Sequence, residues 1–261
     1  MIFKTLRHLS LDIVAGSLGQ LHLFSGYFGV VISWEVYALL GSAVWLIYTA
    51  DHIIDGTSIK QPIKDRYLFH RSYKTVLLVA MALVAVCGLV LLFRIPSNLL
   101  IYGLLLSALS IAYLLLSKWL GSFFSKELLV AIVYALGIFL PLIGSVSVGR
   151  LVVPSINLAI LAFINLISIS HFEREVDTKE GIASLASKLS VDNMEWMLLV
   201  LTIFSLAFSL LSGFTTLAFY FLCVGLIYLG LVRFKVWASQ KSRYRVLSDG
   251  AFLLSFIFAL F

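Results

Sequence analysis

Nine apolar segments, each long enough to form a helix that crosses a bilayer, constrain this chain more than any other feature. They cover residues 11–33, 35–55, 75–93, 97–117, 127–148, 151–171, 194–212, 215–233 and 246–261. The chain is 61% hydrophobic and only 12% charged, whereas a soluble domain is about half apolar and about a quarter charged. Because a spanning helix needs about 20 apolar residues, the sequence predicts an all-α, polytopic membrane protein. Its nine transmembrane helices would form a single domain over residues 1–261.

The basic residues between these segments predict how the chain is oriented in its membrane. If the N-terminus is cytoplasmic, all 19 Lys and Arg residues except Arg94 and Arg150 fall on the inner side. The inner loops of membrane proteins carry such an excess of positive charge. We therefore interpret the net charge of +6 as a signal of topology in the cell (inner) membrane, with cytoplasmic active-site loops, and we expect no nucleic-acid binding.

Two pairs of acidic residues lie on the predicted inner side. Asp51 and Asp55 end the second apolar segment, and Glu173 and Asp177 follow the sixth. Residues four apart share one face of a helix, and ionisable groups so close to a bilayer usually face a polar cavity and function there. Carboxylate and phosphate oxygens are the ligands that Mg²⁺ prefers. The two pairs therefore predict a site for two Mg²⁺ ions bridged by a diphosphate.

The surroundings of this predicted metal site suit an amphiphilic substrate. The inner loops are rich in Lys and Arg, which can bind the remaining charge of a diphosphate. The membrane segments are rich in Leu, Ile and Phe, which suit a long apolar tail. In the loops that follow the two acidic pairs, Arg66 and Lys179 are candidate substrate-binding residues.

The residues around the two pairs also match a known pattern. The motif Asp-His-Ile-Ile-Asp-Gly begins at Asp51, and Glu-Arg-Glu-Val-Asp begins at Glu173 and leads to Gly181. With the nine-helix layout, which covers nearly the whole chain, these motifs resemble the UbiA superfamily of intramembrane prenyltransferases. The resemblance implies transfer of an isoprenyl group from a prenyl diphosphate to an aromatic or other lipid-precursor acceptor, with Mg²⁺ as cofactor and the bilayer as surroundings.

The same resemblance implies roles for particular residues. Catalysis and metal binding would fall to Asp51, Asp55, Glu173 and Asp177. Substrate binding would involve Tyr113 and Lys118, which approximate the family's Tyr-x-x-x-Lys motif.

Three departures mark the chain as a divergent member of that superfamily. The first family motif reads Asn-Asp-x-x-Asp-x-x-x-Asp, and either alignment of Asp51 and Asp55 lacks one of its ligands. Glu173 stands where the family has Asp and reaches one methylene further. Tyr113 and Lys118 are one residue further apart than the family motif requires. The acceptor, the prenyl chain length and the oligomeric state are therefore not predicted.

Two other functions are open on the sequence alone. A terpene cyclase of the same superfamily would act on the prenyl diphosphate without an acceptor, and a membrane transporter or lipid-binding protein would perform no chemistry. Among single residues, Glu175 and Glu180 are expected to be solvated loop charges. Arg245 and Asp249, four residues apart, are expected to pair on one helix.

Overall fold

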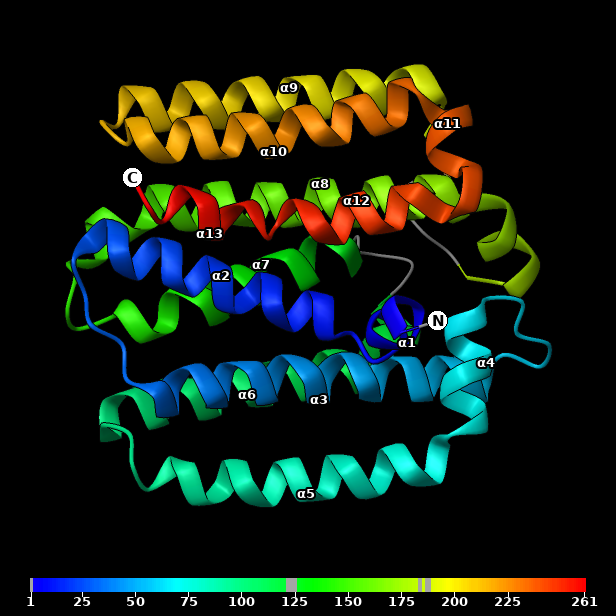
Figure 1. The fold of residues 1–261 in the computed structure, drawn as a ribbon, viewed down its shortest axis with the longest axis horizontal. Helices are drawn as coiled ribbons and strands as arrows, with labels where there is room; N and C mark the ends of the chain where they lie inside the picture. The colour runs from blue at the N-terminus through cyan, green and yellow to red at the C-terminus, as the bar shows by residue number, and fades with distance from the viewer. Residues whose placement is uncertain (1, 121–125, 183–184, 186–188) are drawn as a thin grey trace.

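The protein is a bundle of helices joined by short loops in the computed structural model, which describes residues 2–120, 126–182, 185 and 189–261 (Figure 1). This part of the chain contains no β-strand. Its helices are α1 (Ile2–His8), α2 (Leu11–Phe28), α3 (Trp34–Ser58), α4 (Asp65–Ser72), α5 (Lys74–Leu92), α6 (Ser97–Leu120), α7 (Lys126–Phe139), α8 (Val148–Glu180), α9 (Val191–Leu211), α10 (Thr215–Arg233), α11 (Lys235–Ser239), α12 (Arg243–Ala251) and α13 (Leu254–Phe258), with short 3₁₀ turns η1 (Leu140–Leu142) and η3 (Gln240–Ser242).

The long helices lie side by side, and the chain reverses direction at each end of the bundle (Figure 1). The short helices α1, α4 and α11 gather at the end where the N-terminus lies, and the C-terminus lies at the opposite end (Figure 1). Helix α8 contacts α7, α9, α10 and α12, and α3 contacts α2, α4 and α5. The two helices that carry the acidic pairs are therefore anchored by several neighbours each.

Two pairs of buried polar side chains bond between helices in the interior of the bundle. Asn157 of α8 donates from Nδ2 to the Ser209 hydroxyl of α9 over 2.8 Å, and Gln20 of α2 donates to the Tyr220 hydroxyl of α10. A polar group in an apolar medium is costly unless it finds such a partner. These bonds therefore join α8 to α9 and α2 to α10.

Five helices are long and apolar enough to cross a membrane, among the residues that were searched. They are Trp34–Ser58, Lys74–Leu92, Val148–Glu180, Val191–Leu211 and Thr215–Arg233. Helix α5 shows why the surroundings must be apolar, because Leu77 is its single buried residue and Leu83 and Leu89 are exposed. A soluble protein rarely exposes so large an apolar surface. The chain is an integral membrane protein.

The predicted count of nine spans is not confirmed. Helix α7 has only 14 residues, because Pro141 in the turn that follows lacks the N–H that a longer helix would need. The predicted last span, 246–261, is divided into α12 and α13. Helix α2 has 18 residues and is not among the five candidate spans.

Two helix ends differ from the predicted segment boundaries in a way that matters for the site. Helix α3 continues to Ser58 and α8 continues to Glu180, so both acidic pairs lie on helices, as their four-residue spacing predicts, and the second pair lies on a part of α8 beyond the predicted apolar segment. Helix α8 ends where Gly181 adopts a left-handed conformation with φ of 73°, and the Ile182 N–H bonds the Asp177 carbonyl. Glycine adopts this conformation without the strain that a side chain brings.

Candidate active site

The first acidic pair lies in the last two turns of α3. Asp55 accepts a hydrogen bond from the Tyr67 hydroxyl of α4, with 3.1 Å between the oxygens. Both Asp51 and Asp55 are half-buried. Among the side chains that the structure describes, no Lys, Arg or His lies within ion-pair distance of either carboxylate. The first pair thus presents two negative charges on one helix face with no cation bound to them.

A glycine next to this pair lets α4 approach α3 closely. A Cβ atom on Gly56 would lie 2.8 Å from the Tyr67 carbonyl oxygen, too close for any larger residue without a backbone shift. The rings of His52 and His70 pack edge to face between the same two helices, with centroids 4.9 Å apart. This tight contact places the Tyr67 side chain beside Asp55.

The second acidic pair, on α8, is surrounded by cationic side chains. Glu173 is contacted at Oε2 by Lys64 Nζ at 2.8 Å and by Arg66 Nη2 at 3.2 Å. At Oε1, the same carboxylate meets the Arg245 guanidinium and the Tyr244 hydroxyl. Lys64 also forms an ion pair with Asp177. Glu173 and Asp177 are 6% and 3% exposed, so these contacts supply the partners that buried carboxylates require.

Two side chains of α4 connect the acidic pairs. Arg66 Nη2 donates to the Tyr67 hydroxyl over 3.3 Å and to Glu173 over 3.2 Å. Tyr67 in turn donates to Asp55. The continuous path from Asp55 through Tyr67 and Arg66 to Glu173 shows that residues more than a hundred positions apart share one site.

Burial and neighbouring charges fix the protonation of both connecting residues. Burial raises the pKa of the Tyr67 hydroxyl above its usual value, and the Asp55 carboxylate adds to this rise although Arg66 opposes it. Burial, the largest single effect, would lower the Arg66 pKa, but the Glu173 carboxylate together with Tyr67 and Asp177 raises it above its usual value. Tyr67 therefore stays a hydrogen-bond donor and Arg66 stays charged at physiological pH.

The prediction that Glu180 is a solvated loop charge is wrong. Its carboxylate accepts hydrogen bonds from the backbone N–H of Ile63 at 2.6 Å and of Lys64 at 3.0 Å. Because α8 extends further than predicted, the segment before α4 crosses its end, and the two N–H groups need an acceptor there. Glu180 therefore holds the chain segment that carries Lys64 and Arg66.

The predicted pairing of Arg245 with Asp249 is also wrong. Arg245 reaches from α12 to Glu173 on α8, and it forms no ion pair with Asp249 among the described side chains. Helix α12 packs on α8, which brings the Arg245 guanidinium to the buried Glu173 carboxylate, and a buried charge requires an oppositely charged partner. No local spacing in the sequence could have indicated this contact.

The other predicted substrate-binding residues have different positions. Arg66 lies in the centre of the site, whereas Lys179 is exposed in the last turn of α8 and makes none of these contacts. Tyr113 and Lys118 lie on α6, in the stretch 113–120 whose side chains are outside the described part of the structure. No motif or spacing in the sequence indicated Tyr67, Tyr244 or Arg245 as residues of this site.

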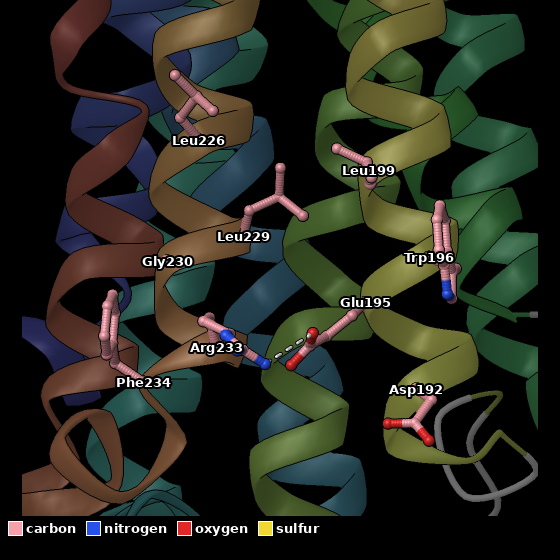
Figure 2. A pocket seen from close by; sticks show the side chains of 9 residues that line it. All are labelled: Asp192, Glu195, Trp196, Leu199, Leu226, Leu229, Gly230, Arg233 and Phe234. Carbon is pink, nitrogen blue, oxygen red and sulfur yellow. Dashed lines mark ion pairs between the residues drawn. The ribbon is translucent and has the colours of Figure 1, made fainter.

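A groove elsewhere on the bundle is separate from this site. It lies between α9 and α10, where Glu195 and Arg233 face each other across the gap at 3.7 Å (Figure 2). Leu199, Leu226 and Trp196 line the rest of it. None of the residues that connect the acidic pairs lines this groove, so it is not the place where those residues would bind a ligand.

The two acidic pairs differ in how well they fit a metal ion. No group of three or more His, Cys, Asp or Glu side chains has metal-binding geometry in the searched part of the chain. Asp51 and Asp55 fit a divalent cation, because they offer hard oxygen ligands that form no ion pair with a described side chain. Glu173 and Asp177 do not fit one as they stand, because Lys64 and the two arginines already compensate them.

These observations define a helical membrane protein with an acidic and basic site at one end of its bundle. The model of the UbiA prenyltransferase family matches residues 64–257, and the chain belongs to this family. The match begins just after the first acidic pair and includes the second. No curated protein sequence matches the chain.

A solved structure shares the fold. It is described in connection with a digeranylgeranylglyceryl phosphate synthase in membranes, and it superposes with a TM-score of 0.58 at 15% sequence identity. The alignment covers 97% of this chain and 98% of that chain. The fold of this protein is therefore similar to that of the synthase over its whole length.

Proposed function

We propose that this protein transfers an isoprenyl group from a prenyl diphosphate to a lipid-precursor acceptor inside the membrane. The observation that carries this proposal is the path from Asp55 through Tyr67 and Arg66 to Glu173. It places anionic and cationic groups together at one end of an apolar bundle, where a diphosphate head group and its long tail would both find partners. Membership of the UbiA prenyltransferase family supports the same reaction.

The cationic residues would bind the diphosphate head group. Lys64, Arg66 and Arg245 come from two separate elements and converge near Glu173. Arginine and lysine form strong, charge-assisted bonds with phosphate oxygens. The prenyl tail would extend from there into the apolar part of the bundle, away from the polar end.

The reaction breaks one bond and forms another. The bond between the allylic carbon and the diphosphate oxygen breaks, and the diphosphate leaves with the electron pair. A nucleophilic atom of the acceptor then bonds to the allylic carbon and gives up a proton. Because negative charge grows on the leaving group, Lys64 and Arg66 would stabilise the transition state more than the ground state.

The predicted Mg²⁺ would be held by Asp51 and Asp55. When bound, the ion supplies further positive charge next to the leaving diphosphate. Tyr67 would keep the Asp55 carboxylate in position by donating to one of its oxygens. Glu173 and Asp177 would hold the basic side chains in place. The excess of basic residues at this end favours a site that opens to the cytoplasm.

Release of pyrophosphate by the purified protein tests this function. Farnesyl, geranylgeranyl and longer prenyl diphosphates would be supplied with and without Mg²⁺ and with membrane extract as the source of acceptor. We expect release that depends on Mg²⁺ and that falls roughly a hundredfold or more in Asp55→Asn, because a charged ligand is lost. Asp192→Asn makes the same chemical change in the α9–α10 groove. It is the matched control and should retain activity.

Each outcome of this experiment distinguishes the possible functions. A prenylated acceptor as product supports the transferase, whereas a cyclic hydrocarbon or alcohol formed without acceptor would identify a cyclase. Folded protein that releases no pyrophosphate with any chain length would contradict an enzymatic function. Flux of a lipid across liposomes in that case would identify a transporter.

A further inference from the structure

The two acidic pairs of the site differ in how many cationic side chains contact them. Around the second acidic pair, three cations face three carboxylates. Lys64, Arg66 and Arg245 contact Glu173, and Lys64 also approaches Asp177 and, at 3.8 Å, Glu180. Around the first pair, no described Lys, Arg or His side chain lies within ion-pair distance of either carboxylate. The carboxylates of one half are already ion-paired, whereas those of the other half have no ion-pair partner among the described side chains.

The two acidic pairs would therefore differ in their affinity for a divalent ion. Next to Asp51 and Asp55 it would neutralise both charges without displacing any side chain. Next to Glu173 it would meet three positive side chains at the oxygens it needs, and like charges at such short range repel strongly in a partly buried site. The donor set of the second pair thus disfavours a metal ion there.

The cations around Glu173 keep some capacity to bind an anion. The Nε atom of Arg66 is buried and has no hydrogen-bond partner. A guanidinium has five N–H donors in a planar fork, and Arg66 uses Nη2 for both Glu173 and Tyr67. Arg66 therefore keeps an unused N–H donor while it stays bonded to Glu173. The longer reach of Glu, compared with Asp, places one carboxylate between Lys64, Arg66 and Arg245 at the same time.

We infer that this protein binds its diphosphate with one divalent cation, held by Asp51 and Asp55, and that Lys64, Arg66 and Arg245 take the place of a second cation. This inference rests on the proposed function, because it concerns the same substrate. It differs from the symmetrical two-ion site that the sequence predicts. In it, Glu173 and Asp177 are positioning residues that hold the basic side chains toward the diphosphate.

Counting bound Mn²⁺ tests the inference without any need for turnover. Mn²⁺ replaces Mg²⁺ as a paramagnetic probe, and a geranylgeranyl thiolodiphosphate that does not ionise replaces the substrate. Titration of the full-length protein in nanodiscs, followed by electron paramagnetic resonance, gives the number of ions bound per chain. We expect one ion per chain in the presence of the analogue. We also expect that Asp55→Asn loses this ion and that Asp177→Asn retains it.

A second variant tests the role of the basic side chains. Arg66→Gln removes a charge-assisted bond, so we expect it to weaken binding of the analogue roughly tenfold to a hundredfold while the count stays at one ion. If Arg66→Gln does not fold, the count in the unmodified protein and in Asp55→Asn still decides the question.

The possible failures can be told apart. Two ions per chain, or one ion that is lost in Asp177→Asn and retained in Asp55→Asn, would overturn the inference and leave the proposed prenyl transfer intact. Analogue binding with no ion at all would also overturn it. Absence of analogue binding by folded protein would overturn both the inference and the proposed function.

Discussion

Single residues of α4 connect the two acidic pairs of the site by hydrogen bonds. Tyr67 is the one described residue whose side chain bonds both to the first acidic pair, through Asp55, and to Arg66, which contacts the second. Its hydroxyl stays protonated because burial raises its pKa, and so it acts as a fixed donor to Asp55. A phenylalanine would have the same shape without this bond.

Tyr67→Phe should therefore reduce activity more than stability. We expect pyrophosphate release to fall roughly tenfold to a hundredfold, because the loss of one hydrogen bond to a charged group corresponds to about 1.5–3 kcal/mol. The thermal unfolding temperature in detergent should change little. Tyr73→Phe, in the exposed turn after α4, is the control with the same chemical change. Equal activity of the two variants would show that the Tyr67 hydroxyl has no part in the reaction.

At the scale of elements, α4 is the piece that assembles the site. It contributes Arg66 and Tyr67, and Lys64 immediately precedes it. A helix of 8 residues has little stability of its own, so its position depends on neighbours. Gly56 allows it to approach α3, and Glu180 at the end of α8 accepts two backbone N–H groups from the segment before it.

Loss of the Glu180 carboxylate should loosen this segment. In Glu180→Ala the N–H groups of Ile63 and Lys64 lose their acceptor, at a local cost of about 1–3 kcal/mol. We expect faster cleavage by trypsin after Lys60 and Lys64 in the folded protein, measured by mass spectrometry of the first fragments. Glu175→Ala removes an exposed carboxylate from the same helix and should leave the cleavage rate unchanged. Unaltered cleavage in both variants would contradict the proposed role of Glu180.

The contact between α9 and α10 depends on a close approach of the two helices. A Cβ atom on Gly225 would lie 2.5 Å from Thr202 Cγ2, whereas one on Gly230 would meet no described atom outside its own helix within 4 Å. The two glycines are on the same helix. They therefore separate the effect of packing from the effect of helix propensity.

Gly225→Ala should destabilise the protein and Gly230→Ala should not. Overpacking of this kind costs about 1–3 kcal/mol, while alanine in a helix interior gains up to about 1 kcal/mol over glycine. Thermal unfolding in detergent should show a lower midpoint for Gly225→Ala and an equal or higher midpoint for Gly230→Ala. A similar decrease in both midpoints would mean that the close contact between Gly225 and Thr202 does not determine the stability of the protein.

At the scale of the whole molecule, one end of the bundle contains the site and the other contains short loops. The acidic pairs, α4 and the basic residues lie at the same end as the N-terminus, and the loop between α2 and α3 lies at the other (Figure 1). The exposed apolar surface of helices such as α5 separates these ends. The orientation of the bundle would thus decide from which side of the membrane the proposed diphosphate substrate enters.

Labelling of single cysteines should establish this orientation. In a variant with Cys87 and Cys223 replaced by Ser, we would introduce Val31→Cys or Lys60→Cys, both at exposed positions. A membrane-impermeant maleimide applied to intact cells, with access to the outer face of the membrane, should label Val31→Cys alone. Lys60→Cys should react only after permeabilisation. The reverse pattern would place the site on the outer side.

Much of the fold followed from the sequence because it depends on local chemistry. Apolar length and the positions of charges are sufficient to predict membrane helices, and the four-residue spacing of Asp51/Asp55 and of Glu173/Asp177 is a property of one helix. The count of spans did not follow from the sequence, because Pro141 and the division between α12 and α13 interrupt segments that are continuous in hydropathy.

The sequence by itself determined a helical membrane protein with two acidic pairs at one end. Only the tertiary structure decided which cations meet these carboxylates. Arg245 and Glu173 are 72 positions apart, and Glu180 meets the N–H groups before α4 because α8 is longer than its apolar part. Such contacts depend on how α4, α8 and α12 pack against one another. Packing is a property of three surfaces together, so no spacing within a single segment could reveal it.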